Sequence, residues 1–338
     1  MLSRLGLPLF LLLLAALASL LLALGIGSAQ IAPGQIWAIV LNDLGFNNLG
    51  PGEIAQGEGD ALARIMVVEL RLPRALSAFA VGGLLAVAGA LMQVLLRNPL
   101  ADPYVLGLSG GASIGALAAM LGGLGGLAIS GSAFSGALFS TFLVFGLAHG
   151  SGGWTPSRLL LTGVVVAAGW GAVITLMLAL SPAERLPGML YWLMGDLSYS
   201  RTPWPPLLLL LVTCVVLVPL GRSLNVLARG PQQAAALGVA VKPLEWCIYI
   251  AASLLTAAAV TTAGSIGFVG LVVPHMLRLL LGNDQRLILP ACALAGGTLL
   301  VLADTLARTM IAPEQLPVGV ITALLGVPTF LFLLYRSR

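Results

Sequence analysis

Ten apolar segments, each roughly 15 to 25 residues long, follow one another along this 338-residue chain with mostly short polar loops between them. This pattern constrains the fold strongly, because a helix of about 20 apolar residues crosses the hydrocarbon layer of a membrane. Several segments are short for that layer, which is acceptable where a span packs against other helices. We therefore predict an all-α polytopic membrane protein with about ten transmembrane helices, several of them short or broken. The segments are residues 5–25, 72–95, 103–122, 133–148, 157–181, 204–220, 244–264, 267–281, 286–306 and 316–335.

Composition excludes a soluble fold. Hydrophobic residues make up 59% of the chain and charged residues only 8%, against about a quarter charged in soluble domains. A water-soluble protein could not bury so much apolar surface. No soluble domain or long linker interrupts the pattern, so we predict one transmembrane domain over residues 1–338. The longest polar stretch, residues 42–69, is expected to be an outer loop between the first two spans.

The N-terminal apolar run has two interpretations. It begins after Arg4 and could belong to a signal peptide, with residues 27–29 as a small-residue cleavage site. The run is about 20 residues long, which exceeds an ordinary signal-peptide core. We therefore favour a first transmembrane helix.

The basic residues predict an orientation when the N-terminus is placed in the cytoplasm and the spans alternate. Ten of the 16 Lys and Arg residues then lie inside and six outside. The positive-inside rule favours this arrangement, with both termini cytoplasmic. The inner set is Arg4, Arg97, Arg158, Arg222, Arg229, Lys242, Arg278, Arg286, Arg336 and Arg338, and the outer set is Arg64, Arg71, Arg74, Arg185, Arg201 and Arg308.

Some chemistry is excluded by missing residues. The only lysine, Lys242, is followed by Pro243, whereas a nucleotide-binding P-loop needs Gly-Lys followed by Ser or Thr. If ATP drives this protein, a partner subunit must bind ATP and Mg²⁺. His149 and His275 lie far apart, and the three cysteines have no paired spacing, so we predict no metal site and no cofactor on this chain.

Small residues recur at four-residue intervals in two segments. Gly107, Gly111 and Gly115 form one ladder, and Gly82, Ala86 and Ala90 form another. Such ladders let helix backbones approach closely in lipid. Tight bundle packing is the expected role.

Two arginines begin the second span on the outer side, where the positive-inside rule disfavours them. They flank Leu72-Pro73, and proline suits the first helical turn. Arg71 and Arg74 could snorkel toward lipid headgroups. They could also form a cationic docking patch for an acidic partner. Asp304 and Arg308 stand four residues apart near another outer helix end and could pair.

The inner loop of residues 221–242 contains a second candidate site. Pro231 can start a short helix and Gly238 can end it, but so short a helix must pack on something to be stable. It could lie on the bilayer. The alternative is a coupling segment that fits a groove on a cytoplasmic ATPase.

Seven motifs, taken in their order and spacing, resemble the permease subunits of bacterial ABC importers for iron-siderophores, haem and cobalamin. The resemblance covers the chain from about residue 64 to the C-terminus. The motifs are Arg71-Leu-Pro-Arg74, Gly89-Ala-Leu-Met-Gln93, Arg97-Asn-Pro-Leu-Ala-Asp-Pro103, Leu106-Gly-Leu-Ser-Gly-Gly-Ala112, Gly264-Ser-Ile-Gly-Phe-Val-Gly-Leu-Val-Val-Pro-His275, Leu316-Pro-Val-Gly319 and Gly326-Val-Pro-Thr-Phe330.

The resemblance implies an inner-membrane permease that pairs with a second permease copy, two cytoplasmic ATPase subunits and a periplasmic substrate-binding protein. It needs no nucleic acid. It implies that Arg71, Arg74 and Arg308 meet the binding protein. Family members often carry acids where Gln232 and Gln233 stand, which weakens the electrostatic part of the ATPase contact. The implied coupling residues are Leu227, Arg229, Gln232, Gln233, Ala234, Leu237, Gly238 and Val239.

The resemblance also implies a translocation pathway lined mainly by the fifth span, with the segment Tyr191–Asp196 beside it. An apolar wall of small residues suits a large, amphiphilic cargo such as haem or a ferric siderophore, because tight pockets would slow its release. Such a permease supplies no covalent chemistry. The alternative function is an ion-coupled secondary transporter that acts without an ATPase. The expected pathway residues are Thr162, Gly163, Ala167, Gly171 and Thr175.

Overall fold

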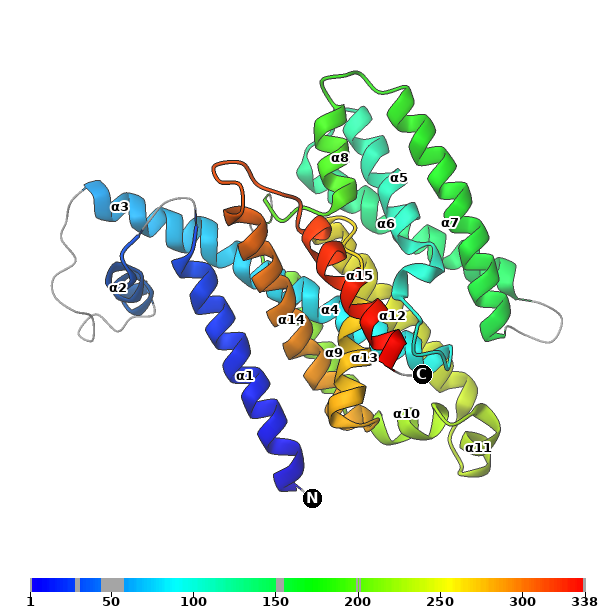
Figure 1. Ribbon diagram of the computed structural model, residues 1–338. Helices are drawn as coiled ribbons and strands as arrows, with labels where there is room; N and C mark the ends of the chain where they lie inside the picture. Colours follow the sequence, from blue (N-terminus) through cyan, green and yellow to red (C-terminus); the bar gives the residue numbers. More distant parts are fainter. Residues whose placement is uncertain are drawn as a thin grey trace.

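The structure is a computed structural model that describes residues 2–27, 31–43, 58–149, 155–198, 200 and 202–336. Every regular element in these ranges is a helix, and the long helices form a bundle with α4 near its centre (Figure 1). The main helices are α1 (Leu2–Gly25), α4 (Leu72–Leu95), α5 (Leu108–Leu121), α6 (Gly126–Ala148), α7 (Pro156–Ala179), α9 (Trp204–Leu217), α12 (Val241–Ala263), α13 (Val269–Leu281), α14 (Gln285–Thr309) and α15 (Val318–Arg336).

These helices correspond one by one to the ten predicted apolar segments, so the predicted fold class is confirmed. Within the described ranges, six helices are long and apolar enough to cross a membrane by themselves. A seventh crossing is the broken pair of α9 and α10 (Gly221–Leu227), which bend by 73° at residues 218–220. Shorter apolar helices at 108–121, 269–281 and 318–333 account for the remaining segments. The prediction of short and broken spans therefore holds.

The prediction of an outer loop over residues 42–69 is wrong in part, because both described ends of this range are helical. Helix α2 (Pro33–Asp43) precedes the gap in the described residues, and α3 (Glu58–Arg64) follows it. A π-helical segment, η1 (Ile65–Arg71), then joins α3 to α4 without a break. Polar residues on one face do not prevent a helix when its other face is apolar, and here Ala63 and Val67 are buried against Ile36 and Ile39 of α2.

A further helix, α8 (Leu186–Met194), was also not predicted. It follows α7 and covers the segment around Tyr191 that the resemblance had placed beside the pathway. With nine residues it is too short to stand out by apolar length. It ends at Gly195, whose φ of 81° is easily adopted only by glycine.

Glycine contacts explain why α4 can lie at the centre. A Cβ atom on Gly82 would overlap the carbonyl oxygen of Gly296 on α14, and one on Gly296 would overlap the carbonyl oxygen of Gly82. Farther along α4, a Cβ on Gly89 would overlap the carbonyl oxygen of Gly270 on α13. The predicted close-packing role of the ladder that begins at Gly82 is therefore confirmed, with α14 as its partner.

The second ladder joins α5 to α6. A side chain on Gly111 would collide with the backbone of Gly136, and one on Gly115 would collide with the backbone of Ser132. The third member, Gly107, precedes α5 with a φ of 69° and accepts a hydrogen bond from Ser140 Oγ at 2.8 Å. This ladder also packs as predicted.

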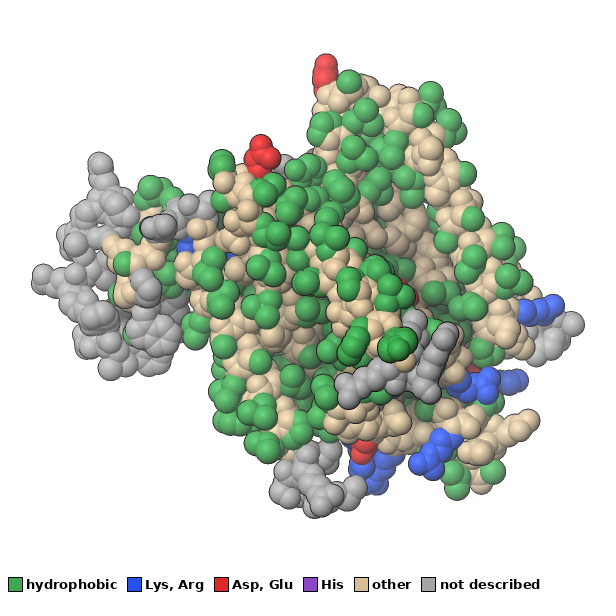
Figure 2. All heavy atoms as spheres, viewed as in Figure 1, with side chains coloured by type: hydrophobic (Ala, Val, Ile, Leu, Met, Phe, Trp, Pro, Cys, Tyr) green, Lys and Arg blue, Asp and Glu red, His purple; other side chains and the backbone are tan. Residues whose placement is uncertain are grey.

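Charged groups separate between the two ends of the bundle. In Figure 2, blue basic side chains gather at the end that carries α10 and α11 (Pro231–Ala236), and red acidic side chains are prominent at the opposite end. Helix α1 packs along α14 with its N-terminus at the basic end (Figure 1). We call the two ends the basic end and the acidic end.

Candidate functional site

Two of the three arginines predicted for docking are buried at the acidic end. Arg71 is 7% exposed and donates from Nη1 to the carbonyl oxygen of Leu24 at 2.7 Å. Arg308 is also 7% exposed, and its Nη2 donates to the carbonyl oxygen of Ala23 at 3.3 Å. Both guanidinium groups thus bind the C-terminal end of α1.

The third arginine, Arg74, pairs with an acid from α14. Its Nη2 lies 2.8 Å from Asp304 Oδ1, and its Nη1 donates to Gln315 Oε1 at 2.7 Å. Arg308 Nε lies 3.2 Å from Asp304 Oδ2 and forms an ion pair with it, so the predicted pairing of Asp304 with Arg308 is confirmed. One buried carboxylate therefore holds two arginines from different helices together.

The docking role of these arginines stays a prediction, and the geometry gives two of them another role. Arg71 and Arg308 have their charged groups turned inward, toward backbone carbonyls and Asp304. Arg74 has hydrogen bonds in exposed positions, to Ser198 and Gln315. Arg74 is the member of the set best placed to meet a partner.

The inner loop forms the short helix that its sequence predicts, α11, and a second one, α10, that was not predicted. Helix α10 runs from the bend after α9, and α11 follows Gly230 with Pro231 in its first turn. Gly238 ends the segment with a φ of 79°. The backbone N–H of Val239 reaches back to the carbonyl oxygen of Ala234 at 2.9 Å, which closes the helix end.

Burial divides the predicted coupling residues into two groups. Leu227 and Ala234 are buried and fix the segment to the bundle, and Val239 is half-buried. The exposed group is Arg229, Gln232, Gln233, Leu237 and Gly238. Leu237 is 71% exposed although its side chain is apolar, and it closely follows the exposed polar residues Gln232 and Gln233 in the chain. The segment therefore presents an apolar side chain framed by two amides.

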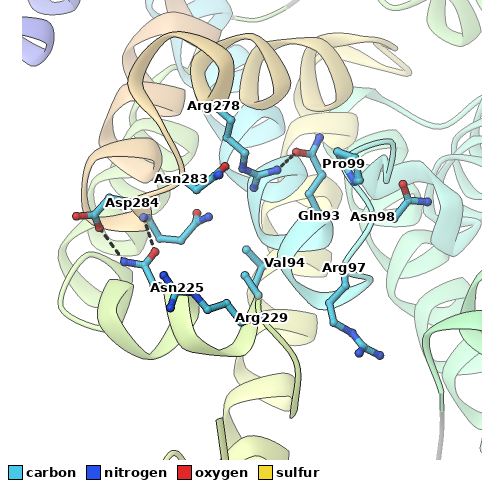
Figure 3. A pocket seen from close by; sticks show the side chains of 12 residues that line it. Gln93, Val94, Arg97, Asn98, Pro99, Asn225, Arg229, Arg278, Asn283 and Asp284 are labelled. Atoms are coloured by element: carbon cyan, nitrogen blue, oxygen red, sulfur yellow. Dashed lines mark hydrogen bonds between the residues drawn. The ribbon is translucent and has the colours of Figure 1, made fainter. Parts of the chain in front are cut away.

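A cavity of about 570 Å³ lies beside this segment, between the end of α4, helix α10 and the connection from α13 to α14 (Figure 3). Sequence reasoning missed it, because its residues come from four separate parts of the chain. Arg229, which was predicted for the ATPase contact, lines this cavity instead of the α11 surface. The lining residues are Gln93, Val94, Arg97, Asn98, Pro99, Asn225, Ala228, Arg229, Arg278, Asn283, Asp284 and Gln285.

The predicted pathway residues lie on α7, at one edge of the bundle (Figure 1). Only 11% of the apolar stretch of α7 that could cross a membrane is buried, against 89% for the corresponding stretch that contains α4. Ala167, Gly171 and Thr175 are exposed and Thr162 is half-buried. Gly163 differs, because a Cβ there would overlap the carbonyl oxygen of Val105 in the short helix η2 (Pro103–Leu106). Gly163 is a packing residue in this chain, and the pathway role of the other four stays a prediction.

The remaining reactive groups form no constellation in the part of the chain that the structure describes. No cluster of three His, Cys, Asp or Glu side chains is close enough to hold a metal ion there. Two Gly-x-Ser-x-Gly patterns, at 107–111 and 111–115, fall in and around α5. Ser109 Oγ lies 2.7 Å from Ser265 Oγ, and Ser113 Oγ donates to the carbonyl oxygen of Ser109. Both serines thus join helical backbone or a neighbouring loop.

A bundle of ten apolar helices, with a short exposed helix at its basic end, defines a polytopic membrane protein of the transport-permease class. The chain belongs to the FecCD transport family, whose model matches residues 12–336. This is a family of transport permeases of ABC importers, and the resemblance noted from the motifs is thereby confirmed.

Named relatives match nearly the whole chain. An uncharacterised ABC transporter permease protein, YvrB of Bacillus subtilis, is 41% identical over 95% of this chain and 91% of its own length. The hemin transport system permease HmuU of Yersinia pestis is 40% identical over 89% and 93%. The cobalamin import system permease BtuC of Halobacterium salinarum is 44% identical over 82% and 74%.

Solved structures agree with this assignment. An ABC transporter described as metal-chelate type, in an inward-facing conformation, superposes with a TM-score of 0.81 at 30% identity. That match covers 97% of this chain and 98% of the solved chain.

Proposed function

We propose that this chain is the membrane-spanning permease subunit of an ATP-driven importer that moves an iron complex, haem or a ferric siderophore, or cobalamin, from periplasm to cytoplasm. The permease class is that of the family, and the cargo is suggested by the relatives named for hemin and cobalamin. The chain itself would bind no ATP and catalyse no covalent step. Differential contacts in two conformations would move the cargo.

The proposed assembly contains a second permease copy, two cytoplasmic ATPase subunits that bind ATP and Mg²⁺, and a periplasmic binding protein. The basic end would face the cytoplasm of a bacterial cell, in agreement with the positive-inside rule, and both termini would lie there. The acidic end would face the periplasm and carry Arg74 toward the binding protein. The exposed face of α7 would border the pathway between the two permease copies.

The observation that carries this proposal is the surface of α11. A leucine that is 71% exposed, beside exposed Gln232 and Gln233, stands at the basic end of the molecule. An apolar side chain at the tip of a short helix is typical of a segment that inserts into a partner's groove. Since Gln232 and Gln233 are uncharged, the contact would depend on shape and apolar burial more than on charge.

The test compares two leucines of similar exposure. Leu237→Ala should reduce copurification of the ATPase subunit and the ATPase activity of the reconstituted complex by about tenfold, because one fully buried leucine at an interface contributes roughly 1.5–3 kcal/mol. Leu280→Ala on α13 removes a side chain that is 75% exposed but lies outside α11, and should leave both unchanged. Equal behaviour of the two variants would remove the coupling role from α11. ATP-independent uptake by the purified chain would favour a secondary transporter.

A further inference from the structure

The cavity at the basic end gathers positive charge from two helices. Arg278 comes from α13, and Arg229 follows the end of α10. Figure 3 shows Arg278 beside Asn283 and Arg229 beside Asn225. Arg278 donates to Gln93 Oε1 and, from Nη2, to the carbonyl oxygen of Ala90 at 3.2 Å. A guanidinium group carries five N–H donors, so these bonds leave donors free to serve the cavity.

The guanidinium group of Arg229 has no hydrogen bond or ion pair within the described ranges, and the side chain is exposed to the cavity. Arg97 also lines the cavity, but Figure 3 shows its side chain pointing away from the other two arginines. Glu245 of α12 acts electrostatically on Arg97 and does not line the cavity. The charge that faces inward therefore comes from Arg229 and Arg278.

Asp284 is the one acid among the lining residues, and its charge is already matched. Its Oδ2 lies 2.6 Å from Arg286 Nη2, and its Oδ1 accepts from Asn225 Nδ2 at 2.9 Å. The hydrogen bond from Arg286, together with the one from Asn225, holds the pKa of this carboxyl well below its usual range. With Asp284 neutralised by Arg286, the lining keeps an excess of positive charge.

The cavity also presents an acceptor that lacks a donor. Gln285 is 2% exposed, lines the cavity and has an Oε1 atom with no hydrogen-bond partner among the described residues. A buried acceptor without a donor is costly, and a bound group or an ordered water would supply the missing donor. The site therefore combines anion-binding guanidinium groups with one place for a hydroxyl hydrogen.

We propose that this cavity binds a phosphate-bearing anion that also carries a hydroxyl group. The phosphate oxygens would accept hydrogen bonds from Arg229 and Arg278, and the hydroxyl would donate to Gln285 Oε1. The volume of about 570 Å³ falls within the range of roughly 300–1,000 Å³ that is usual for small-molecule sites. Two sources supply this chemistry at the basic end: hydrogenphosphate from solution, and the phosphoglycerol headgroup of an anionic lipid.

The test uses the purified full-length chain and two probes. Binding of radiolabelled inorganic phosphate is measured in neutral detergent. Retention of phosphatidylglycerol, with phosphatidylcholine as the comparison lipid, is measured by native mass spectrometry. Arg229→Gln removes one donor group, and Asn283→Asp puts a negative charge on an exposed side chain of the lining. Each should weaken binding about tenfold, and Arg222→Gln, an exposed arginine of α10 outside the cavity, should not.

Both positive outcomes support the site and identify the source. Retention of phosphatidylglycerol without phosphate binding assigns the lipid, whereas phosphate binding that displaces the lipid assigns the free anion. The proposal is overturned if neither probe binds the wild-type chain, or if both variants bind like Arg222→Gln. Loss of the ATPase subunit from Arg229→Gln, with anion binding unchanged, would also overturn it and assign Arg229 to the partner contact.

Discussion

At the scale of single residues, arginines at the acidic end donate hydrogen bonds to backbone carbonyl oxygens in the last turn of a helix, which have no partner within that helix. Arg71 and Arg308 do so at the end of α1, and Arg185 donates to the carbonyl oxygens of Met120 and Leu121 at the end of α5. The last four carbonyls of a helix lack internal partners and carry partial negative charge. This explains why arginines occur at the acidic end of the bundle.

We expect Arg71→Ala to destabilise the fold by about 1–3 kcal/mol, because the carbonyl oxygen of Leu24 loses its donor in a buried setting. The apparent melting temperature in detergent should fall by a few degrees. Arg158→Ala, which removes an exposed arginine at the start of α7, serves as the control and should melt like the wild type. A wild-type melting temperature for Arg71→Ala would argue against a structural role for Arg71 and would favour the docking role.

The loop after α4 depends on two side chains that cap backbone groups. Asn98 Oδ1 accepts from the backbone N–H of Leu100 at 2.9 Å, and Asp102 Oδ1 accepts from that of Tyr104 at 2.8 Å. Burial raises the pKa of Asp102 above the usual value of a carboxyl group. Because the folded pKa exceeds the unfolded one, protonation favours the folded state, and this contribution to stability grows as the pH falls through the folded pKa.

Asp102→Asn should therefore be at least as stable as the wild type at neutral pH, since asparagine keeps the cap without the buried charge. Asp102→Ala should be about 1 kcal/mol less stable than Asp102→Asn, because it loses the cap. Thermal unfolding between about pH 4 and 7, a range that spans the usual carboxyl pKa and the raised pKa of about 6, checks both points. The stability gap between wild type and Asp102→Asn should close toward the acidic limit; a gap that widens there would contradict the assignment.

How far the sequence could predict these residues depends on the range of their contacts. The cap at Asp102 is local, since a carboxylate two residues before an N–H is a recognisable turn signal. The pairing of Asp304 with Arg308 was also predictable, because both lie on one helix face. The partners of Arg71 and Arg308 were not predictable, because the end of α1 reaches them only through the tertiary fold.

At the scale of helices, α4 holds the bundle together through backbone contact. Gly82 and Gly89 let it touch α14 and α13 without intervening side chains. The sequence predicted the close approach at the first ladder but not the partner, because a small-residue stripe does not say which helix it meets. Neither Gly296 nor Gly270, the matching glycines, belongs to either of the two predicted ladders.

Gly296→Val should severely destabilise the protein, because its Cβ would overlap the backbone of Gly82 and force α4 and α14 apart. Overpacking of this kind costs about 1–3 kcal/mol or more. The matched control is Gly146→Val on α6, where no atom lies within 4 Å of the added Cβ. Expression level and gel-filtration profile in detergent are the readouts, and equal behaviour of the two variants would disprove the contact.

At the scale of the whole molecule, α7 stands out because it is long and apolar but packs over only a small part of its surface against the rest of the described chain. The buried share of its membrane-length apolar stretch is 11%, the lowest among the six membrane-length helices of the described ranges. The sequence could identify α7 as a span but not as an edge, because exposure depends on where the other helices pack. In the proposed importer, a second copy would cover this face.

A cross-linking experiment tests that arrangement. On a background in which Cys214, Cys247 and Cys292 are replaced by alanine, Gly171→Cys should give a disulfide-linked dimer after mild oxidation, because Gly171 lies on the exposed face of α7. Leu211→Cys on α9, another exposed position, should stay monomeric. Similar cross-linking of both variants would indicate random collision and would argue against α7 as the dimer surface.

The 73° bend between α9 and α10 has a mechanical consequence. Helix α10 turns steeply away from the axis of α9 while Leu224 and Leu227 stay packed on the bundle, and its seven residues form an arm about 10 Å long, at 1.5 Å per residue. Each degree of rotation at residues 218–220 would then displace the far end of the arm by about 0.2 Å. A force that acts on the far end of α10, parallel to the axis of α9, would exert a torque at residues 218–220. The bend therefore makes α10 a lever that converts an axial force into a sideways tilt of α9.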